Sequence, residues 1–148
     1  MSSQLDLKHS DITSKILHAF FKRVYQDLGY GFLEKVYENA MALELQQMGL
    51  DVRQQARIHV HYAGRVVGEY FADLLVEDAV IFEIRAARQT LKEHEAQLLN
   101  YLRATPYEVG LLLNFGPRPD FRCKVFDNQR KPTQTWISAK TESSSDKP

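Results

Sequence analysis

The sequence has a single cysteine, no long apolar run and a formal net charge of zero, and each of these features excludes a class of protein. Cys123 is the single cysteine among 148 residues, so a disulfide framework and a multi-cysteine zinc site are excluded. No apolar run approaches the roughly 18 residues of a membrane span, and the first residues lack the apolar core of a secretory signal. Lys plus Arg and Asp plus Glu each total 19, which argues against binding of nucleic acid through bulk positive charge. We expect a cytoplasmic protein that does not bind membranes.

The periodic segments predict one α/β domain. Apolar residues recur at helical spacing over 11–28 and predict a second helix between Gly31 and Gly49. The predicted apolar stripe of this second helix consists of Leu33, Val36, Tyr37, Ala40, Met41 and Leu45. Strands are predicted at 52–62, 66–76, 80–86, 109–115 and 121–126, with a helix at 91–104. This order predicts an α/β sandwich in which a mixed central sheet of about five strands is flanked by helices. Residues 1–137 are expected to form the domain, and the polar, Ser-rich residues 138–148 a disordered tail.

Acidic and basic residues are separated along the chain. The stretch 69–83 contains five acids and no Lys or Arg, whereas 118–131 carries five bases against two acids. An acidic pocket beside a basic rim suits a metal-dependent phosphodiesterase, because acids hold the cation and bases such as Arg118, Arg122 and Lys124 hold phosphates. Solvated surface charge is the alternative interpretation.

Two carboxylates stand in apolar strand contexts. Asp73 and Glu83 lie on consecutive predicted strands joined by a short turn, so a hairpin would bring them together. A buried carboxylate needs a partner because its desolvation costs several kcal/mol. With the carbonyl of Ile84 they could supply half of an octahedral magnesium shell. Arg85 follows on the same strand face, and an ion pair of Arg85 with Asp73 or Glu83, without metal, is the alternative.

Polar side chains also recur on the predicted helices. Glu34 and Tyr37 are three residues apart and share a helical face, as do His94, Gln97 and Tyr101 on the later helix. Each group suits either a functional stripe or a solvated surface.

Three further candidates have simpler interpretations. His59 and His61 share one strand face but lack a third metal ligand, so we expect them to be exposed. Cys123 lies in a predicted strand without a base partner and is expected to be a core residue rather than a nucleophile.

Together these pieces resemble the GxxExxY proteins, a branch of the PD-(D/E)XK nuclease superfamily. The name motif is present as Gly31, Glu34 and Tyr37. The similar segments are the strand pair 70–78 and 80–86, the helix 94–105 and the strand 110–116.

The resemblance implies a restriction-endonuclease-like fold and a set of roles. Asp73 and Glu83 would be ligands of Mg²⁺ or Mn²⁺, together with the Ile84 carbonyl, and Glu34 would be an auxiliary acid. Gln97 and Tyr101 are similar to the Q-x-x-x-Y helix motif of RecB-type exonucleases. Tyr37 would contribute to substrate binding.

One position departs from the superfamily pattern. Arg85 stands where the pattern has Lys. Arginine keeps the positive charge and can grip a phosphate with two bonds, but its pKa above about 12 prevents it from acting as a general base. We therefore expect a slow or degenerate site, in which the metal or Glu34 activates the water.

The sequence thus predicts a Mg²⁺- or Mn²⁺-dependent phosphodiesterase of nuclease type, with DNA as the expected nucleic acid. The alternative is a catalytically inactive module on the same fold that binds nucleic acid or a protein. A third interpretation is a purely structural homo-oligomer in which Glu83 and Arg85 form a buried ion pair. A homodimer is compatible with each of the three.

Overall fold

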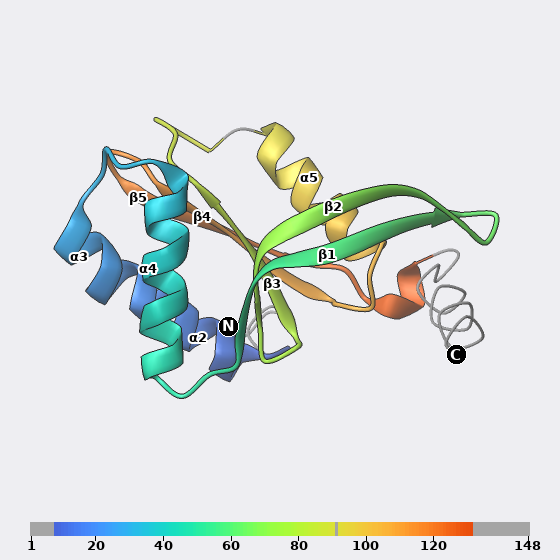
Figure 1. Ribbon diagram of the computed structural model, residues 1–148, viewed down its shortest axis with the longest axis horizontal. Coiled ribbons are helices and arrows are strands. Elements are labelled where there is room, and N and C mark those ends of the chain that lie inside the picture. Colours follow the sequence, from blue (N-terminus) through green and yellow to red (C-terminus); the bar gives the residue numbers. More distant parts are fainter. Residues whose placement is uncertain (1–7, 91, 132–148) are drawn as a thin grey trace.

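The chain forms a mixed sheet with helices on both faces (Figure 1). The computed structural model describes residues 8–90 and 92–131, so the predicted domain end at 137 and the predicted tail at 138–148 lie outside the described residues. The elements are α2 (Ser10–His18), the π-helical η1 (Ala19–Val24), α3 (Tyr25–Leu28), α4 (Glu34–Gln47), β1 (Val52–Tyr62), β2 (Arg65–Val76), β3 (Val80–Arg85), α5 (Lys92–Arg103), β4 (Val109–Phe115), β5 (Pro119–Val125) and the 3₁₀ turn η2 (Asn128–Arg130).

The sheet confirms the predicted α/β class. Its five strands lie in the order β1-β2-β3-β4-β5. The pairs β1–β2, β2–β3 and β4–β5 are antiparallel, whereas β3 and β4 are parallel. Parallel neighbours need a long crossover, and α5 provides it. No helix in the described part of the chain is long and apolar enough to cross a membrane.

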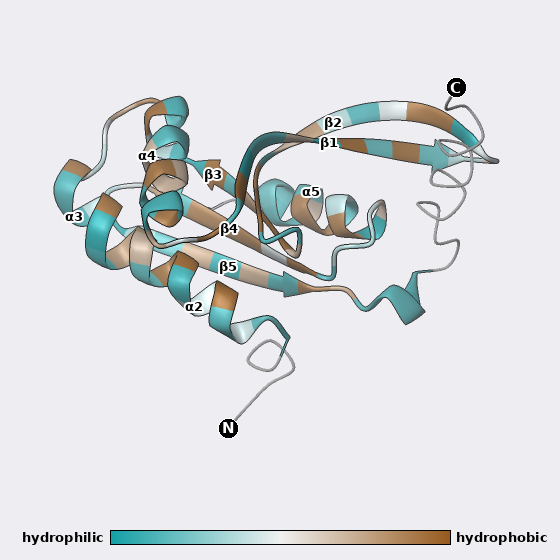
Figure 2. Cartoon of the chain, turned by 60° about the horizontal axis from the view of Figure 1, so that its bottom comes forward, coloured by the Kyte–Doolittle hydropathy of each residue, from teal (hydrophilic) through white to brown (hydrophobic). Residues whose placement is uncertain are grey.

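Two apolar cores cover the two faces of the sheet. The larger core packs α2, η1 and α4 against one face, with Phe20, Met41 and Phe82 among its fully buried members. The smaller core packs α5 against the other face through Leu98 and Leu102. Figure 2 shows that β3 and β4 are hydrophobic along most of their length, as expected for central strands covered on both sides.

The start of α4 differs from the predicted apolar stripe. Leu33 is 80% exposed and has extended backbone, because the helix begins only at Glu34. Val36 is exposed as well, whereas Tyr37 and Glu38 are buried. The helix is therefore rotated about its axis from the predicted phase, and a carboxylate enters its inner face.

The β1–β2 hairpin extends beyond the rest of the sheet and contains two irregularities (Figure 1). Gln55 has a left-handed backbone, with φ of 54°, and is skipped in the pairing with β2. A register shift follows between Val60 and His61. A one-residue shift moves side chains to the opposite face. The prediction that His61 is exposed was therefore wrong: His61 is buried and Tyr62 points to solvent.

Candidate active site

The two predicted carboxylates meet where β2 and β3 diverge. The last paired residues before this point are Leu74 and Phe82. Beyond this pair, the carboxylates take the place of backbone carbonyls as hydrogen-bond acceptors between the two strands. The N–H of Asp73 donates to Glu83 Oε2 at 2.9 Å, and the N–H of Ile84 donates to Asp73 Oδ2 at 2.8 Å. These bonds fix each carboxylate against the backbone of the opposite strand.

Arg85 places a cation among the three predicted metal-ligand oxygens. Its Nη1 donates to the Ile84 carbonyl at 2.8 Å. The same atom lies 3.7 Å from Glu83 Oε1 and 3.9 Å from Asp73 Oδ2. Three oxygens on two strands therefore converge on one positively charged nitrogen.

The carboxylates are costly to ionise in this position. Burial, reinforced by the charge of Asp73, raises the pKa of Glu83 to about 8, although hydrogen bonding from the Asp73 backbone and the nearby Arg85 act against the rise. Burial also raises the pKa of Asp73, opposed by its bond from the Ile84 backbone. A bound cation would favour the ionised forms of both groups.

Helix α5 holds the guanidinium from the other side. Nη2 of Arg85 donates to Gln97 Oε1 at 2.9 Å, and Gln97 Nε2 donates to the Tyr101 hydroxyl at 2.8 Å. Burial, and then the negative charge of Glu83, raises the pKa of Tyr101. The two residues picked out by their spacing on the helix thus form one chain of hydrogen bonds that ends at Arg85.

Sequence reasoning missed Glu38, an acid that is buried close to the site. Its carboxylate accepts hydrogen bonds from Gln54 at 2.8 Å, Gln55 at 3.0 Å and Lys35 at 3.2 Å. Gln55 Nε2 also lies 3.4 Å from Asp73 Oδ1 and so connects Glu38 to the site. The available signal was the glutamate directly after Tyr37, on what becomes the inner face of α4.

The GxxExxY residues have different positions. Gly31 has a φ of 114°, a conformation that favours glycine. Glu34 is exposed at the first position of α4. Tyr37 is fully buried, stacks on Phe115 with ring centroids 4.1 Å apart, and donates its hydroxyl to the Gly29 carbonyl at 2.9 Å. Its position assigns Tyr37 a structural role in the loop before α4, in place of the expected substrate contact.

The predicted phosphate-binding bases lie at β5, at the far edge of the sheet from β1. Arg122 contacts Asp120 at 2.9 Å, and Lys124 contacts Glu95 of α5 at 2.7 Å. These acids offset much of the charge of the two bases. Arg118 is exposed in the loop before β5.

The oxygens around Arg85 are of the types that bind divalent cations. Two carboxylates and a carbonyl are the hard oxygen ligands that Mg²⁺ prefers. Within residues 8–90 and 92–131, no three His, Cys, Asp or Glu side chains are grouped to hold a metal by themselves. The third oxygen is the Ile84 carbonyl, to which Arg85 is now hydrogen-bonded.

Comparisons with known proteins give one family match and several similar solved structures. A family model described as the PD-(D/E)XK nuclease superfamily matches residues 10–125. Among solved structures, the SSO0001 protein is 18% identical over 77% of this chain and 59% of its own, with a TM-score of 0.49. An alkaline exonuclease from Laribacter hongkongensis is 14% identical over 75% of this chain and 66% of its own, with a TM-score of 0.48. The chain therefore spans less than two thirds of either protein. No curated protein matches it.

Proposed function

This chain belongs to the PD-(D/E)XK nuclease superfamily, and from that premise we propose that it is a metal-dependent phosphodiesterase of the GxxExxY type that acts on nucleic acid. The observation that carries the proposal is the convergence of the Asp73, Glu83 and Ile84 oxygens on one cationic nitrogen. Oxygens from two strands that surround a cation at one point make a cation site, and a divalent ion suits this set better than a monovalent side chain.

Each residue at the site has a separable role in this proposal. Mg²⁺ or Mn²⁺ held by Asp73, Glu83 and the Ile84 carbonyl would polarise the scissile phosphate and lower the pKa of a bound water. Arg85 leaves these oxygens and grips non-bridging phosphate oxygens with its guanidinium, a geometry that arginine provides in two parallel bonds. Gln97 and Tyr101 limit where the guanidinium can go, because the glutamine amide is anchored on the tyrosine hydroxyl.

Further acids and bases would support this arrangement. Glu38 keeps Gln55 oriented toward Asp73. Glu34 is exposed at the start of α4 and is the candidate for contact with the attacking water from outside the buried site. Arg118, Arg122 and Lys124 would contact phosphates further along the strand, Arg118 most readily because it is exposed.

A cleavage assay tests the proposal. Purified wild type is incubated with labelled single- and double-stranded DNA, and with RNA, in Mg²⁺, Mn²⁺ or EDTA. We expect metal-dependent cleavage that falls by about 10²–10³-fold in Asp73→Asn. The matched control is Glu69→Gln, an exposed acid on the same strand. Metal-independent cleavage, or equal cleavage by both variants, would overturn the proposal.

The position of Arg85 favours a second candidate function. A guanidinium that never leaves the three oxygens would make the domain a metal-free module that binds nucleic acid. Such a module would bind DNA without cleaving it in any metal, and its affinity would fall steeply as salt rises. A protein-binding module would show much weaker salt dependence.

A further inference from the structure

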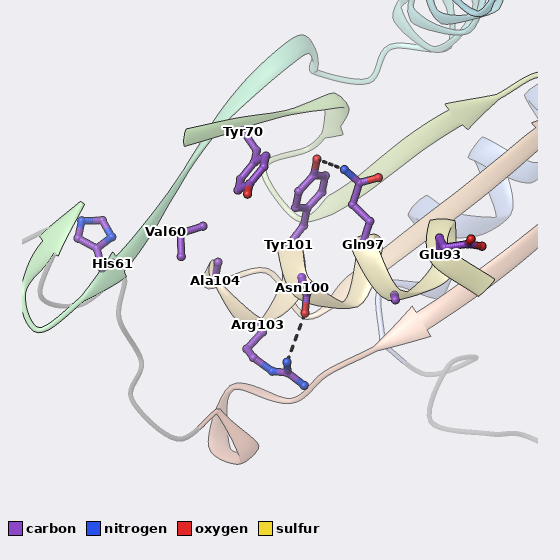
Figure 3. Close-up of a pocket in the computed structure, with 10 residues that line it drawn as sticks. Val60, His61, Tyr70, Glu93, Gln97, Asn100, Tyr101, Arg103 and Ala104 are labelled. Atoms are coloured by element: carbon purple, nitrogen blue, oxygen red, sulfur yellow. Dashed lines mark hydrogen bonds between the residues drawn. The ribbon is translucent and has the colours of Figure 1, made fainter. Parts of the chain in front are cut away.

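A pocket lies beside the candidate active site, between the β1–β2 hairpin and α5 (Figure 3). Its volume is about 590 Å³, within the range of roughly 300–1,000 Å³ typical of small-ligand sites. Val60, His61 and Tyr70 line it from the hairpin, and residues from Glu93 to Ala104 line it from the helix.

Two aromatic rings form the part of the pocket nearest the site. Tyr70 and Tyr101 face each other with centroids 5.8 Å apart and planes tilted by 42°. The Tyr101 ring is held by the hydrogen bond from Gln97, whereas Tyr70 is 48% exposed. The Tyr101 ring is therefore fixed in position, whereas the more exposed Tyr70 ring can move to admit a planar group.

Polar groups line the rest of the pocket. Asn100 presents an amide whose oxygen accepts from Arg103 at 3.3 Å. His61, at the hairpin end, is 7% exposed, and its Nδ1 has no hydrogen-bond partner among the described residues. A buried polar atom without a protein partner gains free energy when a ligand supplies a hydrogen bond. Aromatic walls with a few polar groups match the surface of a nucleobase, which has flat faces and polar edges.

The pocket and the active site share a wall. Gln97 lines the pocket and accepts the hydrogen bond from Arg85. Tyr101 lines it as well and is within the electrostatic reach of Glu83. Gln97 therefore connects Arg85 to the pocket that Tyr70 and Tyr101 line.

We propose that this pocket receives an unpaired nucleobase of a single-stranded nucleic acid whose backbone lies at Arg85. The inference rests on the proposed function only for the backbone position. A base stacked and paired inside a duplex cannot enter a pocket between a hairpin and a helix, whereas a base of a single strand is free to stack on side chains. The preferred substrate class is therefore single-stranded nucleic acid, or a duplex end whose last bases are unpaired.

The test uses short DNA strands that carry 2-aminopurine, a base whose fluorescence is quenched by stacking, in EDTA so that no cleavage occurs. We expect quenching by wild type and an affinity loss of roughly 5- to 150-fold in Tyr70→Ala. The matched control is Phe71→Ala: Phe71 is the next residue of β2, faces the other way and is 42% exposed. A strand with an abasic residue in place of 2-aminopurine should bind wild type and Tyr70→Ala equally.

The outcomes separate the two proposals. Equal effects of Tyr70→Ala and Phe71→Ala, tight binding of blunt duplex, or no binding of single strands at low salt would overturn the base pocket. Quenching without cleavage in any metal would keep the pocket and overturn the phosphodiesterase. Free 2-aminopurine nucleoside, tested alone, shows whether the pocket takes a free base or one carried by a strand; tight binding of the free form alone would contradict the strand proposal. Melting temperatures of both variants verify that they fold.

Discussion

Replacement of Arg85 by methionine should convert a weak metal site into a tighter one. The guanidinium of Arg85 makes two hydrogen bonds, to the Ile84 carbonyl at 2.8 Å and to Gln97 at 2.9 Å. Hydrogen bonds of charged groups contribute about 1.5–3 kcal/mol each, and a metal that enters must displace the first and disturb the second. Because water and phosphate replace part of this energy, we expect a net penalty of about 1.4–2.8 kcal/mol, or roughly 10- to 100-fold in metal affinity.

The same substitution should destabilise the protein when metal is absent. The Ile84 carbonyl and Gln97 lose the guanidinium that donates to them at 2.8 and 2.9 Å, and each hydrogen bond of a charged group contributes about 1.5–3 kcal/mol. In EDTA the melting temperature of Arg85→Met should therefore fall by roughly 5–15 °C. Metal at one hundred times its dissociation constant should restore about 2.7 kcal/mol of stability, which raises the melting temperature by roughly 5–10 °C.

The assay is a thermal melt across a series of Mg²⁺ and Mn²⁺ concentrations, with wild type, Arg85→Met and Arg85→Met combined with Asp73→Asn. The double variant should lose the metal response, because one ligand oxygen is replaced. The reasoning fails if Arg85→Met and wild type respond to metal at the same concentration, since the guanidinium would then not compete for the oxygens.

Three further predictions follow from other contacts. Glu83→Gln should remove a pH dependence: the pKa of Glu83 is raised from 4.5 to about 8, so the stability that this group contributes is complete below about pH 4.5 and is lost as the pH rises through about 8. Melts from pH 4 to 9 would contradict this if wild type and Glu83→Gln run parallel. Glu38→Gln should reduce kcat by about tenfold, because Glu38 accepts the hydrogen bond that keeps Gln55 oriented toward Asp73. Measurements of kcat and KM check this effect, and an unchanged kcat would refute the role of Glu38. Lys131→Met should lower the free energy of unfolding by about 1–3 kcal/mol, because Lys131 Nζ donates to two carbonyls at 2.8 Å. Denaturant unfolding measures this loss, with the exposed neighbour Arg130→Met as the control. Equal midpoints of the two variants would refute the role of those hydrogen bonds.

Much of the fold could be predicted because its central strands consist mostly of apolar residues. The predicted strand 109–115 matches β4, Val109–Phe115, residue for residue. The meeting of Asp73 and Glu83 followed from the short turn between two strands, and their hydrogen bond confirms it. Periodicity alone was sufficient wherever one face of an element is uniformly buried.

The incorrect and missing predictions concern residues at which the regular pattern of buried and exposed side chains is interrupted. His61 was predicted to be exposed, and the register shift beside it turns its side chain inward. Glu38 was overlooked because the rotation of α4 depends on where its first turn begins, and a polar residue on an inner face gives no periodic signal. For Arg85 the sequence left an ion pair and a metal as alternatives, because charge complementarity cannot decide between two cations for the same oxygens.

In the proposed site, the placement of Arg85 would couple the binding of metal to the binding of substrate, even without direct contact between the two ligands. A cation attached to the chain cannot diffuse away, so a free ion binds only during the fraction of time in which the guanidinium is elsewhere. If that fraction is about one per cent, the apparent dissociation constant rises about 100-fold. A phosphate that draws Arg85 outward raises the fraction, and each ligand then increases the affinity for the other by the same factor. A domain of this design would stay without metal until a strand arrives, and cooperativity would arise from one side chain that changes partners.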